Sequence, residues 1–177
     1  MKNTDLLIVG AGIVGLTLAY QIKKRFPENK IIIIDKEDEI GLHCSGRNSG
    51  VLHAGVYYKP KTLKALVSVE GAKRLKEWCK EENIRILNCG KVITPQQNHL
   101  DKQLDVLLAR GTANGAKVEI IDSKEFKKIV PDARTSSGRA LWSPDTAVVN
   151  PKEILLRLEK RLIEMGVEII KSSYITQ

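Results

Sequence analysis

The feature that most constrains the fold is a glycine-rich run near the N-terminus, Gly10-Ala-Gly-Ile-Val-Gly15, which fits the pattern G-x-G-x-x-G. It directly follows a continuous apolar stretch, Leu6–Val9, and opens a segment with helical periodicity that Pro27 ends. A second apolar stretch, Ile31–Ile34, completes a strand–helix–strand unit of about 30 residues. The pattern predicts a parallel βαβ unit whose turn binds a diphosphate.

The three glycines of this turn have separate roles. Gly10 permits a sharp exit from the strand, Gly12 lets a diphosphate approach bare backbone, and Gly15 lets helix and strand pack closely. Backbone N–H groups at the start of the helix then face the diphosphate, and the positive end of the helix dipole favours the anion. The helix residues predicted to make this contact are Ile13 and Val14.

A carboxylate stands at the end of the second predicted strand. Asp35 follows Gly15 at the spacing of about 20 residues expected for the residue that accepts hydrogen bonds from a ribose. A carboxylate repels a 2′-phosphate, so Asp35 favours FAD or NAD over NADP, although its neighbour Lys36 weakens that distinction. The glycine pattern by itself leaves the choice between FAD and NAD open.

Composition excludes several classes of protein. The 177 residues carry a net charge of +8, with 42% hydrophobic and 28% charged residues, which is typical of a globular chain with a core. Three cysteines without a Cys-x-x-Cys pair predict neither a disulfide framework nor a zinc site, and favour a reducing compartment such as the cytoplasm. No apolar run approaches the roughly 20 residues of a membrane span. The sequence shows neither a basic helix nor an aromatic platform, so it does not predict nucleic-acid binding.

A second informative stretch runs from residue 41 to residue 60 and is polar, glycine-rich and without periodicity. It offers hydroxyl and amide groups, one guanidinium for a phosphate, and one titratable ring. Because it follows the second strand of a dinucleotide-binding unit, it is predicted to be a second loop that contacts the cofactor. The residues that supply these groups are Ser45, Arg47, Asn48, Ser49 and His53.

The run from Asn48 to Pro60, Asn-Ser-Gly-Val-Leu-His-Ala-Gly-Val-Tyr-Tyr-Lys-Pro, resembles the L-2-hydroxyglutarate oxidase/dehydrogenase family of D-amino-acid-oxidase-like, FAD-dependent oxidoreductases. The resemblance extends over nearly the whole chain. It implies an α/β class: a Rossmann-like FAD-binding fold with the G-x-G-x-x-G βαβ unit, plus part of an inserted α+β segment of the substrate domain. We expect residues 1–84 and 140–177 to form the incomplete FAD-binding domain and residues 85–139 the inserted segment.

The resemblance also implies a cofactor site for FAD and no metal. Asp35 replaces the glutamate more usual at the adenosine ribose, and the backbone of Ile175 occupies the place that meets the adenine. The residues expected to contact FAD are Gly10, Gly12, Ile13, Val14, Gly15, Asp35, Lys36, Ser45, Arg47, Asn48, Ser49, Gly50 and Ile175.

By the same resemblance, His53 lies near the flavin, and three roles are open to it: a catalytic base, a covalent attachment point for the flavin, or a hydrogen-bond partner of the ring or loop. The implied reaction oxidises a 2-hydroxy dicarboxylate to the 2-oxo acid by hydride transfer to the flavin. Oxygen or a membrane quinone would then receive the electrons. This is compatible with a cytoplasmic protein that attaches peripherally to the inner face of a membrane.

Three other interpretations stay open on the residues alone. One is another flavoenzyme of the same superfamily, such as an amine or amino-acid oxidase or a glycerol-3-phosphate dehydrogenase. The others are an NAD-dependent dehydrogenase and a non-catalytic nucleotide-binding or oligomerising module. Relatives of the family are considerably longer, so we expect this chain to be an N-terminal portion that is weakly active or inactive alone. Exposed sheet edges would then favour self-association.

Overall fold

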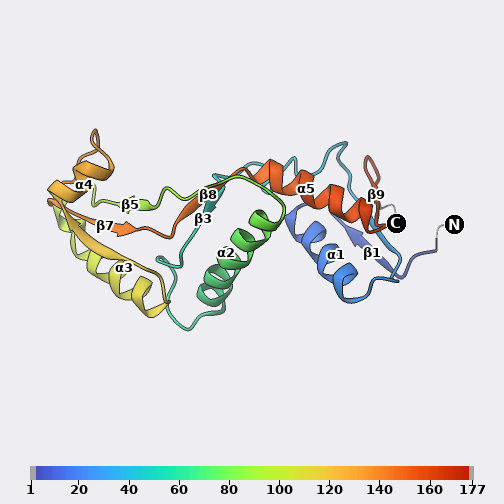
Figure 1. Ribbon diagram of the computed structural model, residues 1–177, viewed down its shortest axis with the longest axis horizontal. Coiled ribbons are helices and arrows are strands. Elements are labelled where there is room, and N and C mark those ends of the chain that lie inside the picture. The colour runs from blue at the N-terminus through green and yellow to red at the C-terminus, as the bar shows by residue number, and fades with distance from the viewer. Residues whose placement is uncertain (1–2, 176–177) are drawn as a thin grey trace. The chain divides into compact units, whose positions relative to one another are not determined.

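The computed structural model describes residues 3–175 and divides the chain into two compact units (Figure 1). The first unit combines the residues up to Gly50 with those from Asn150 onward, and the second unit is the intervening Val51–Val149.

The first unit is built on a parallel three-stranded sheet in the order β1-β2-β9. Its strands are β1 (Leu6–Val9), β2 (Ile31–Ile34) and β9 (Glu168–Ile170), and its helices are α1 (Ile13–Arg25) and α5 (Pro151–Glu164). The central strand β2 pairs with both neighbours, Ile33 lying opposite Ile8 on one side and Ile169 on the other. The predicted βαβ unit is therefore confirmed, and β9 joins it from the far end of the chain.

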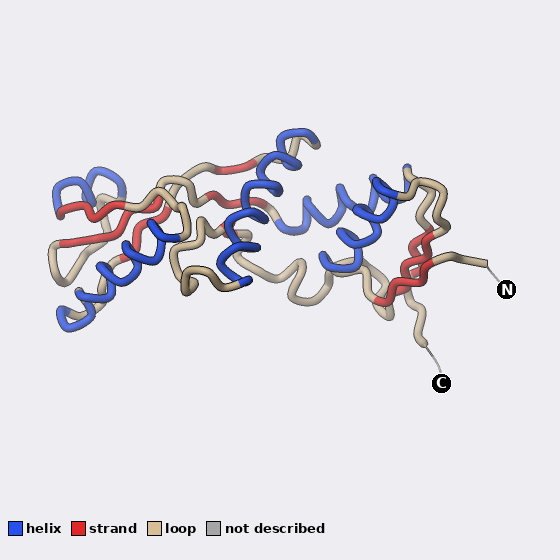
Figure 2. Tube along the Cα trace, turned by 90° about the horizontal axis from the view of Figure 1, so that it is seen from below, coloured by secondary structure: helices blue, strands red, loops and turns tan. Residues whose placement is uncertain are grey.

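Both helices lie on the same side of this sheet (Figure 2) and contact each other. They bury the core of the unit, while Leu7 and Val9 of β1 stay 48% and 63% exposed. The buried residues of this core are Ile8, Leu16, Ala19, Ile31, Ile33, Ile154, Leu155, Leu158, Leu162 and Val167.

Local chemistry sets the helix ends. The buried ammonium group of Lys23 binds the carbonyl oxygens of Pro27 and Asn29 where α1 ends, so its charge is partly compensated there. At the start of α5, the side chain of Asn150 accepts a hydrogen bond from the backbone N–H of Lys152, and Pro151 occupies the first helical position.

The second unit holds two antiparallel sheets, in the orders β3-β8-β4 and β5-β7-β6. Its strands are β3 (Val51–Leu52), β4 (Ile86–Leu87), β5 (Lys91–Ile93), β6 (Glu119–Asp122), β7 (Arg139–Ser143) and β8 (Ala147–Val149). Its helices are α2 (Leu63–Glu81), the short 3₁₀ helix η1 (Asn98–Leu100), α3 (Lys102–Ala113) and α4 (Ser123–Ile129). Helix α3 packs on the second of these sheets, with Leu104 and Leu141 in a shared core cluster.

The division of the chain into these two units falls at other residues than the expected boundaries at residues 84 and 140. Val51 of β3 pairs with Val148 of β8, and Ile86 of β4 pairs with Val149. These long-range pairs place residues 51–84 and 140–149 in the second unit. The division therefore falls after Gly50 and before Asn150.

Two negative findings apply to residues 3–175. No helix there is both long and apolar enough to cross a membrane, and no group of three or more histidine, cysteine or acidic residues could hold a metal ion. The three cysteines Cys44, Cys79 and Cys89 are free thiols.

Candidate cofactor site and the His53 segment

The glycine turn between β1 and α1 is closely packed. Gly10 has a φ of +106°, which favours glycine, and its backbone N–H donates a hydrogen bond of 2.7 Å to the carbonyl of Ile34 in β2. A Cβ on Gly15 would lie 2.0 Å from the carbonyl oxygen of Gly10. Helix α1 can therefore start this close to the turn only because residue 15 has no side chain.

The N-terminus of α1 has no side-chain cap from its own N-cap residue, Gly12, and no acidic residue in its first turn. Instead the backbone N–H of Ile13 donates a hydrogen bond of 3.0 Å to the hydroxyl oxygen of Ser45. A Cβ on Gly12 would lie 3.0 Å from that oxygen. The structure thus brings one sequence-predicted loop residue, Ser45, directly to the predicted diphosphate-binding helix end.

Asp35 links three segments of the first unit. One carboxylate oxygen accepts a hydrogen bond of 2.6 Å from the backbone N–H of Ala11, and the other accepts one of 3.0 Å from the N–H of Glu37. The backbone N–H of Asp35 donates to the carbonyl of Ile170, and its carbonyl accepts from the N–H of Ser173. Each carboxylate oxygen keeps lone-pair capacity beyond these bonds.

Two other residues predicted to contact the cofactor, Lys36 and Ile175, lie near Asp35 in the sequence or in the fold. Lys36 is exposed and lies 3.5 Å from the Glu37 carboxylate, which also pairs with the His43 ring at 2.8 Å. The hydrogen bond from His43 lowers the pKa of Glu37 below its usual value, and Lys36 adds to this effect. Ile175 is 64% exposed and lies two residues beyond the bond between Ser173 and Asp35, so the chain after β9 passes the end of β2.

The loop from Gly41 to Gly50 is held together by Asn48. Its amide nitrogen donates to the carbonyls of Cys44 and Ser45, at 3.0 and 2.9 Å, and its carbonyl oxygen accepts from the N–H of Gly50. The three bonds fix the conformation of the loop. The side chains of Arg47 and Ser49 are exposed.

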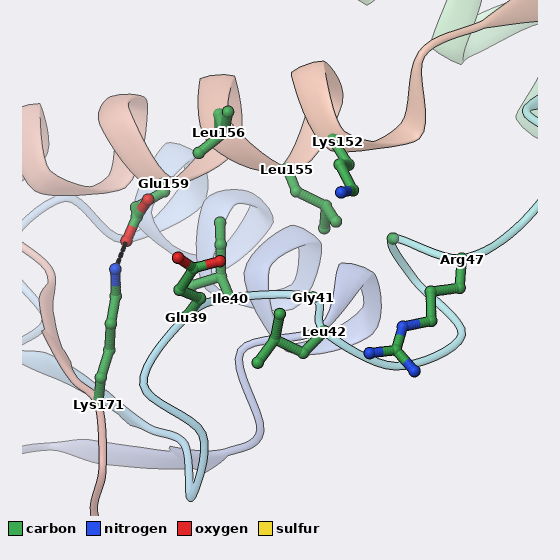
Figure 3. Close-up of a pocket in the computed structure, with 11 residues that line it drawn as sticks. Glu39, Ile40, Gly41, Leu42, Arg47, Lys152, Leu155, Leu156, Glu159 and Lys171 are labelled. Atoms are coloured by element: carbon green, nitrogen blue, oxygen red, sulfur yellow. Dashed lines mark ion pairs between the residues drawn. The ribbon is translucent and has the colours of Figure 1, made fainter.

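A pocket of about 470 Å³ lies between this loop and α5 (Figure 3). Leucine and isoleucine side chains supply its apolar wall, and the ion pair of Glu159 with Lys171, 2.7 Å apart, stands at its edge. The loop approaches α5 through Gly41, where a Cβ would lie 2.3 Å from a methyl group of Leu155. Sequence reasoning missed this pocket, because residues of α5 carry no local motif that connects them with the loop.

His53 belongs to the second unit and follows β3. Its ring is partly buried and makes an edge-to-face contact with Tyr57, with 5.8 Å between the ring centroids and 80° between the planes. Burial lowers the pKa of His53 from its ordinary value, and the positive charge of Lys91 lowers it further. Both causes favour the neutral form of the ring, which is the form that can accept a proton.

Sequence reasoning also missed Lys91 and Asn114, which support the His53 segment. The Lys91 ammonium lies 4.5 Å from the centroid of the Tyr57 ring. Asn114, at the end of α3, donates to the carbonyls of Gly55 and Tyr58 at 2.8 and 2.9 Å. Both are single polar residues outside any motif, so no signal in the sequence singles them out.

Comparison with known proteins decides the family. The model of the family described as "FAD dependent oxidoreductase" matches residues 5–177. The chain belongs to the FAD-dependent oxidoreductases. This confirms the predicted family and FAD as its cofactor, and it resolves the choice between FAD and NAD that the glycine pattern left open.

Curated relatives share a more specific name. L-2-hydroxyglutarate dehydrogenase, mitochondrial, of Dictyostelium discoideum is 39% identical over 85% of this chain and 34% of its own length. The protein of the same name from Caenorhabditis elegans is 38% identical over 97% of this chain and 40% of its own length, and the human one is 35% identical over 96% and 36%. The chain therefore spans between a third and two fifths of these relatives.

Solved structures confirm the predicted fold class. L-α-glycerophosphate oxidase of Mycoplasma pneumoniae with FAD bound aligns over the whole chain and 47% of its own, with a TM-score of 0.88 and 23% identity. Glycine oxidase of Geobacillus kaustophilus aligns over 97% of this chain and 47% of its own, with a TM-score of 0.87 and 16% identity. At these identities the likeness shows the fold alone.

Proposed function

We propose that the complete protein oxidises L-2-hydroxyglutarate, a 2-hydroxy dicarboxylate, to 2-oxoglutarate, and that this chain supplies its diphosphate-binding turn and its His53 segment. The observation that carries the proposal is the identity of 39% with a relative of that name over 85% of this chain. We propose further that the chain alone is weakly active or inactive, because the relatives are more than twice as long.

The geometry of the first unit fits FAD. The absence of a side chain at Gly15 lets α1 start directly beside the turn, and the N-terminus of α1 attracts a diphosphate. The Ser45 hydroxyl, which now accepts from Ile13, can turn to donate to a phosphate oxygen. Asp35 accepts from the ribose through its remaining lone pairs. Arg47, exposed in the loop, supplies charge for the phosphates.

Bound FAD supplies the acceptor for the hydride that leaves the hydroxyl-bearing carbon. The protein holds that carbon in place and removes the hydroxyl proton. We assign the proton to His53, since its lowered pKa favours the neutral form of the ring. If the flavin were attached covalently to His53 instead, it would stay with the chain after denaturation and precipitation. Release of free FAD under those conditions contradicts attachment.

Oxygen or a quinone is the proposed final electron acceptor. The proposed location is the cytoplasm, with peripheral contact at a membrane. Several relatives are named mitochondrial, while a bacterial relative from Indibacter alkaliphilus, 36% identical, bears the enzyme name without that word.

A second candidate function is a nucleotide-binding module that self-associates. It is favoured by apolar residues on α2 that stay more than half exposed, Leu63, Leu66 and Val67. Sedimentation of the chain with and without FAD separates a monomer from such an assembly.

The proposed activity is tested by anaerobic reduction of bound flavin. L-2-hydroxyglutarate should bleach the oxidised flavin spectrum of a chimera in which the remainder of the C. elegans relative follows this chain, and D-2-hydroxyglutarate should not. The chain alone, loaded with FAD, should react at least about a hundredfold more slowly, a difference of about 2.7 kcal/mol in barrier. A chimera that folds and holds FAD but ignores the L-enantiomer contradicts the proposal.

A further inference from the structure

Lys91 is a partly buried cation beside the His53 segment. Its ammonium group lies over the Tyr57 ring, 4.5 Å from the centroid. Among the ion pairs between residues 3–175, none involves Lys91. An ammonium group has three donors, and a ring face satisfies the charge only in part. The group therefore has the capacity to bind an anion.

The backbone around Lys91 is firmly placed. Gly90 has a φ of +67°, and its N–H donates a hydrogen bond of 2.9 Å to the carbonyl of Thr146. A Cβ on Gly90 would lie 2.0 Å from the Trp142 ring, so the chain passes directly against that side chain. Lys91 itself pairs with Ser143 across β5 and β7. The ammonium group thus extends from a fixed strand rather than from a surface loop.

Tyr57 connects Lys91 with His53. One face of its ring receives the ammonium group, and its ring makes the edge-to-face contact with the imidazole. The segment that carries both rings is held by Asn114 through the carbonyls of Gly55 and Tyr58. His53, Tyr57 and Lys91 therefore form one contiguous group within the second unit, which we call the His53 cluster.

We propose that Lys91 binds a carboxylate of the 2-hydroxy dicarboxylate beside His53, so that one member of the His53 cluster holds the substrate while another receives its hydroxyl proton. This inference rests on the proposed function and names a substrate-binding residue for it. The two residues then have different roles: the Lys91 ammonium group binds the substrate carboxylate, whereas the His53 imidazole accepts the proton at a ring nitrogen.

The arrangement couples substrate binding to the basicity of His53. The Lys91 charge and the Tyr57 ring lie near the imidazole, and Arg110 donates a hydrogen bond of 3.4 Å to the Tyr57 carbonyl. Burial is the larger cause of the lowered pKa of the ring, and the Lys91 charge lowers this pKa further. A carboxylate that neutralises Lys91 removes this effect, and the pKa of His53 then rises toward its ordinary value. The base becomes stronger when substrate arrives.

The test is an NMR titration of the His53 ring in the 177-residue chain, which has only three histidines. Lys91→Met should raise the pKa of His53, and Lys91→Arg should leave it near the wild-type value. L-2-hydroxyglutarate should raise the pKa in the wild type and not in Lys91→Met, where it should bind about tenfold more weakly, the loss expected for one charge-assisted contact.

The chain offers a matched control in Lys64→Met. Lys64 lies over the neighbouring Tyr58 ring, 4.9 Å from its centroid, so this variant removes the same charge and the same kind of ring contact. It should leave His53 and dicarboxylate binding unchanged. The ring of His43, paired with Glu37 in the first unit, serves as the reference signal.

Two results overturn the proposal: no response of wild-type His53 to L-2-hydroxyglutarate, or an equal response in Lys91→Met. Flavin reduction is measured separately in the chimera. If the carboxylate site depends on Lys91 while flavin is not reduced, the binding site stands and the proposed function fails. If flavin is reduced while Lys91→Met changes neither His53 nor dicarboxylate affinity, the function stands and the inference is wrong.

Discussion

The carboxylate of Asp35 accepts a 2.6 Å hydrogen bond from the backbone N–H of Ala11, which joins the end of β2 to the glycine turn. The residue predicted to hold the ribose therefore also fixes the shape of the diphosphate-binding turn. A single side chain connects the two halves of the proposed cofactor site.

Replacement of Asp35 by asparagine should weaken FAD binding and stability together. The amide retains one acceptor oxygen, so either Ala11 or Glu37 loses its partner, at a cost of about 1–2 kcal/mol in the free energy of unfolding. Urea denaturation and FAD fluorescence titration measure the two effects. Asp38→Asn, at an exposed position, is the control. Unchanged FAD affinity in Asp35→Asn would contradict the dual role.

Substitution by alanine should reduce stability and FAD affinity at Gly15 but not at Gly71. In Gly15→Ala the Cβ would lie 2.0 Å from the Gly10 carbonyl, and the displaced helix should cost about 1–3 kcal/mol and weaken FAD binding at least about tenfold. Gly71, within α2, has nothing within 4 Å of an added Cβ. Gly71→Ala should stabilise the chain by about 0.5–1 kcal/mol. Thermal melts and FAD titration distinguish these opposite outcomes. Equal effects of the two substitutions would contradict the claim that close packing at Gly15 excludes a side chain.

Asn114→Asp should loosen the segment that carries His53. The substitution replaces the donor of two hydrogen bonds by a carboxylate oxygen that faces the carbonyls of Gly55 and Tyr58, which should cost about 1–3 kcal/mol. Amide hydrogen exchange over residues 53–59 should accelerate. Asn98→Asp adds the same charge at an exposed position and should change little. Protection that survives in Asn114→Asp would show that other contacts hold the segment.

The start of α4 should contribute to acid sensitivity. Hydrogen bonds from the backbone N–H groups of Glu125 and Lys124 lower the pKa of Asp122. A carboxyl group whose pKa is lowered on folding stabilises above its unfolded pKa, and this contribution disappears as the pH falls through the folded value. Asp122→Asn should therefore lose less stability between neutral pH and about pH 3 than the wild type does. Urea midpoints at both pH values test this, with Asp132→Asn as control.

The sequence predicted what depends on local pattern. The apolar run before Gly10, the glycine spacing and the position of Asp35 are local, and β1, α1 and β2 follow them. The unit boundaries depend on the pairing of β3 with β8, between segments far apart in the chain, which no local pattern reveals.

Residue roles were harder to predict than residue positions. Asn48 was predicted to contact the cofactor, and no signal in the sequence indicated that its side chain also holds its own loop together. Ser45 was predicted to contact the cofactor from its loop, and its hydrogen bond with the first helix could not be predicted from the sequence. Lys91 and Asn114 gain significance from the residues that tertiary folding places around them, so a linear pattern could not identify them.

The pairing of β2 with β9 has a consequence for biosynthesis. The glycine turn leaves the ribosome early, but β9, which pairs with the other edge of β2, follows only after the whole second unit has been made. Until then β2 has one free edge and Asp35 lacks its bonds to Ile170 and Ser173. We therefore expect FAD to load late during synthesis of the chain, and substitutions that slow folding of the second unit should delay loading further.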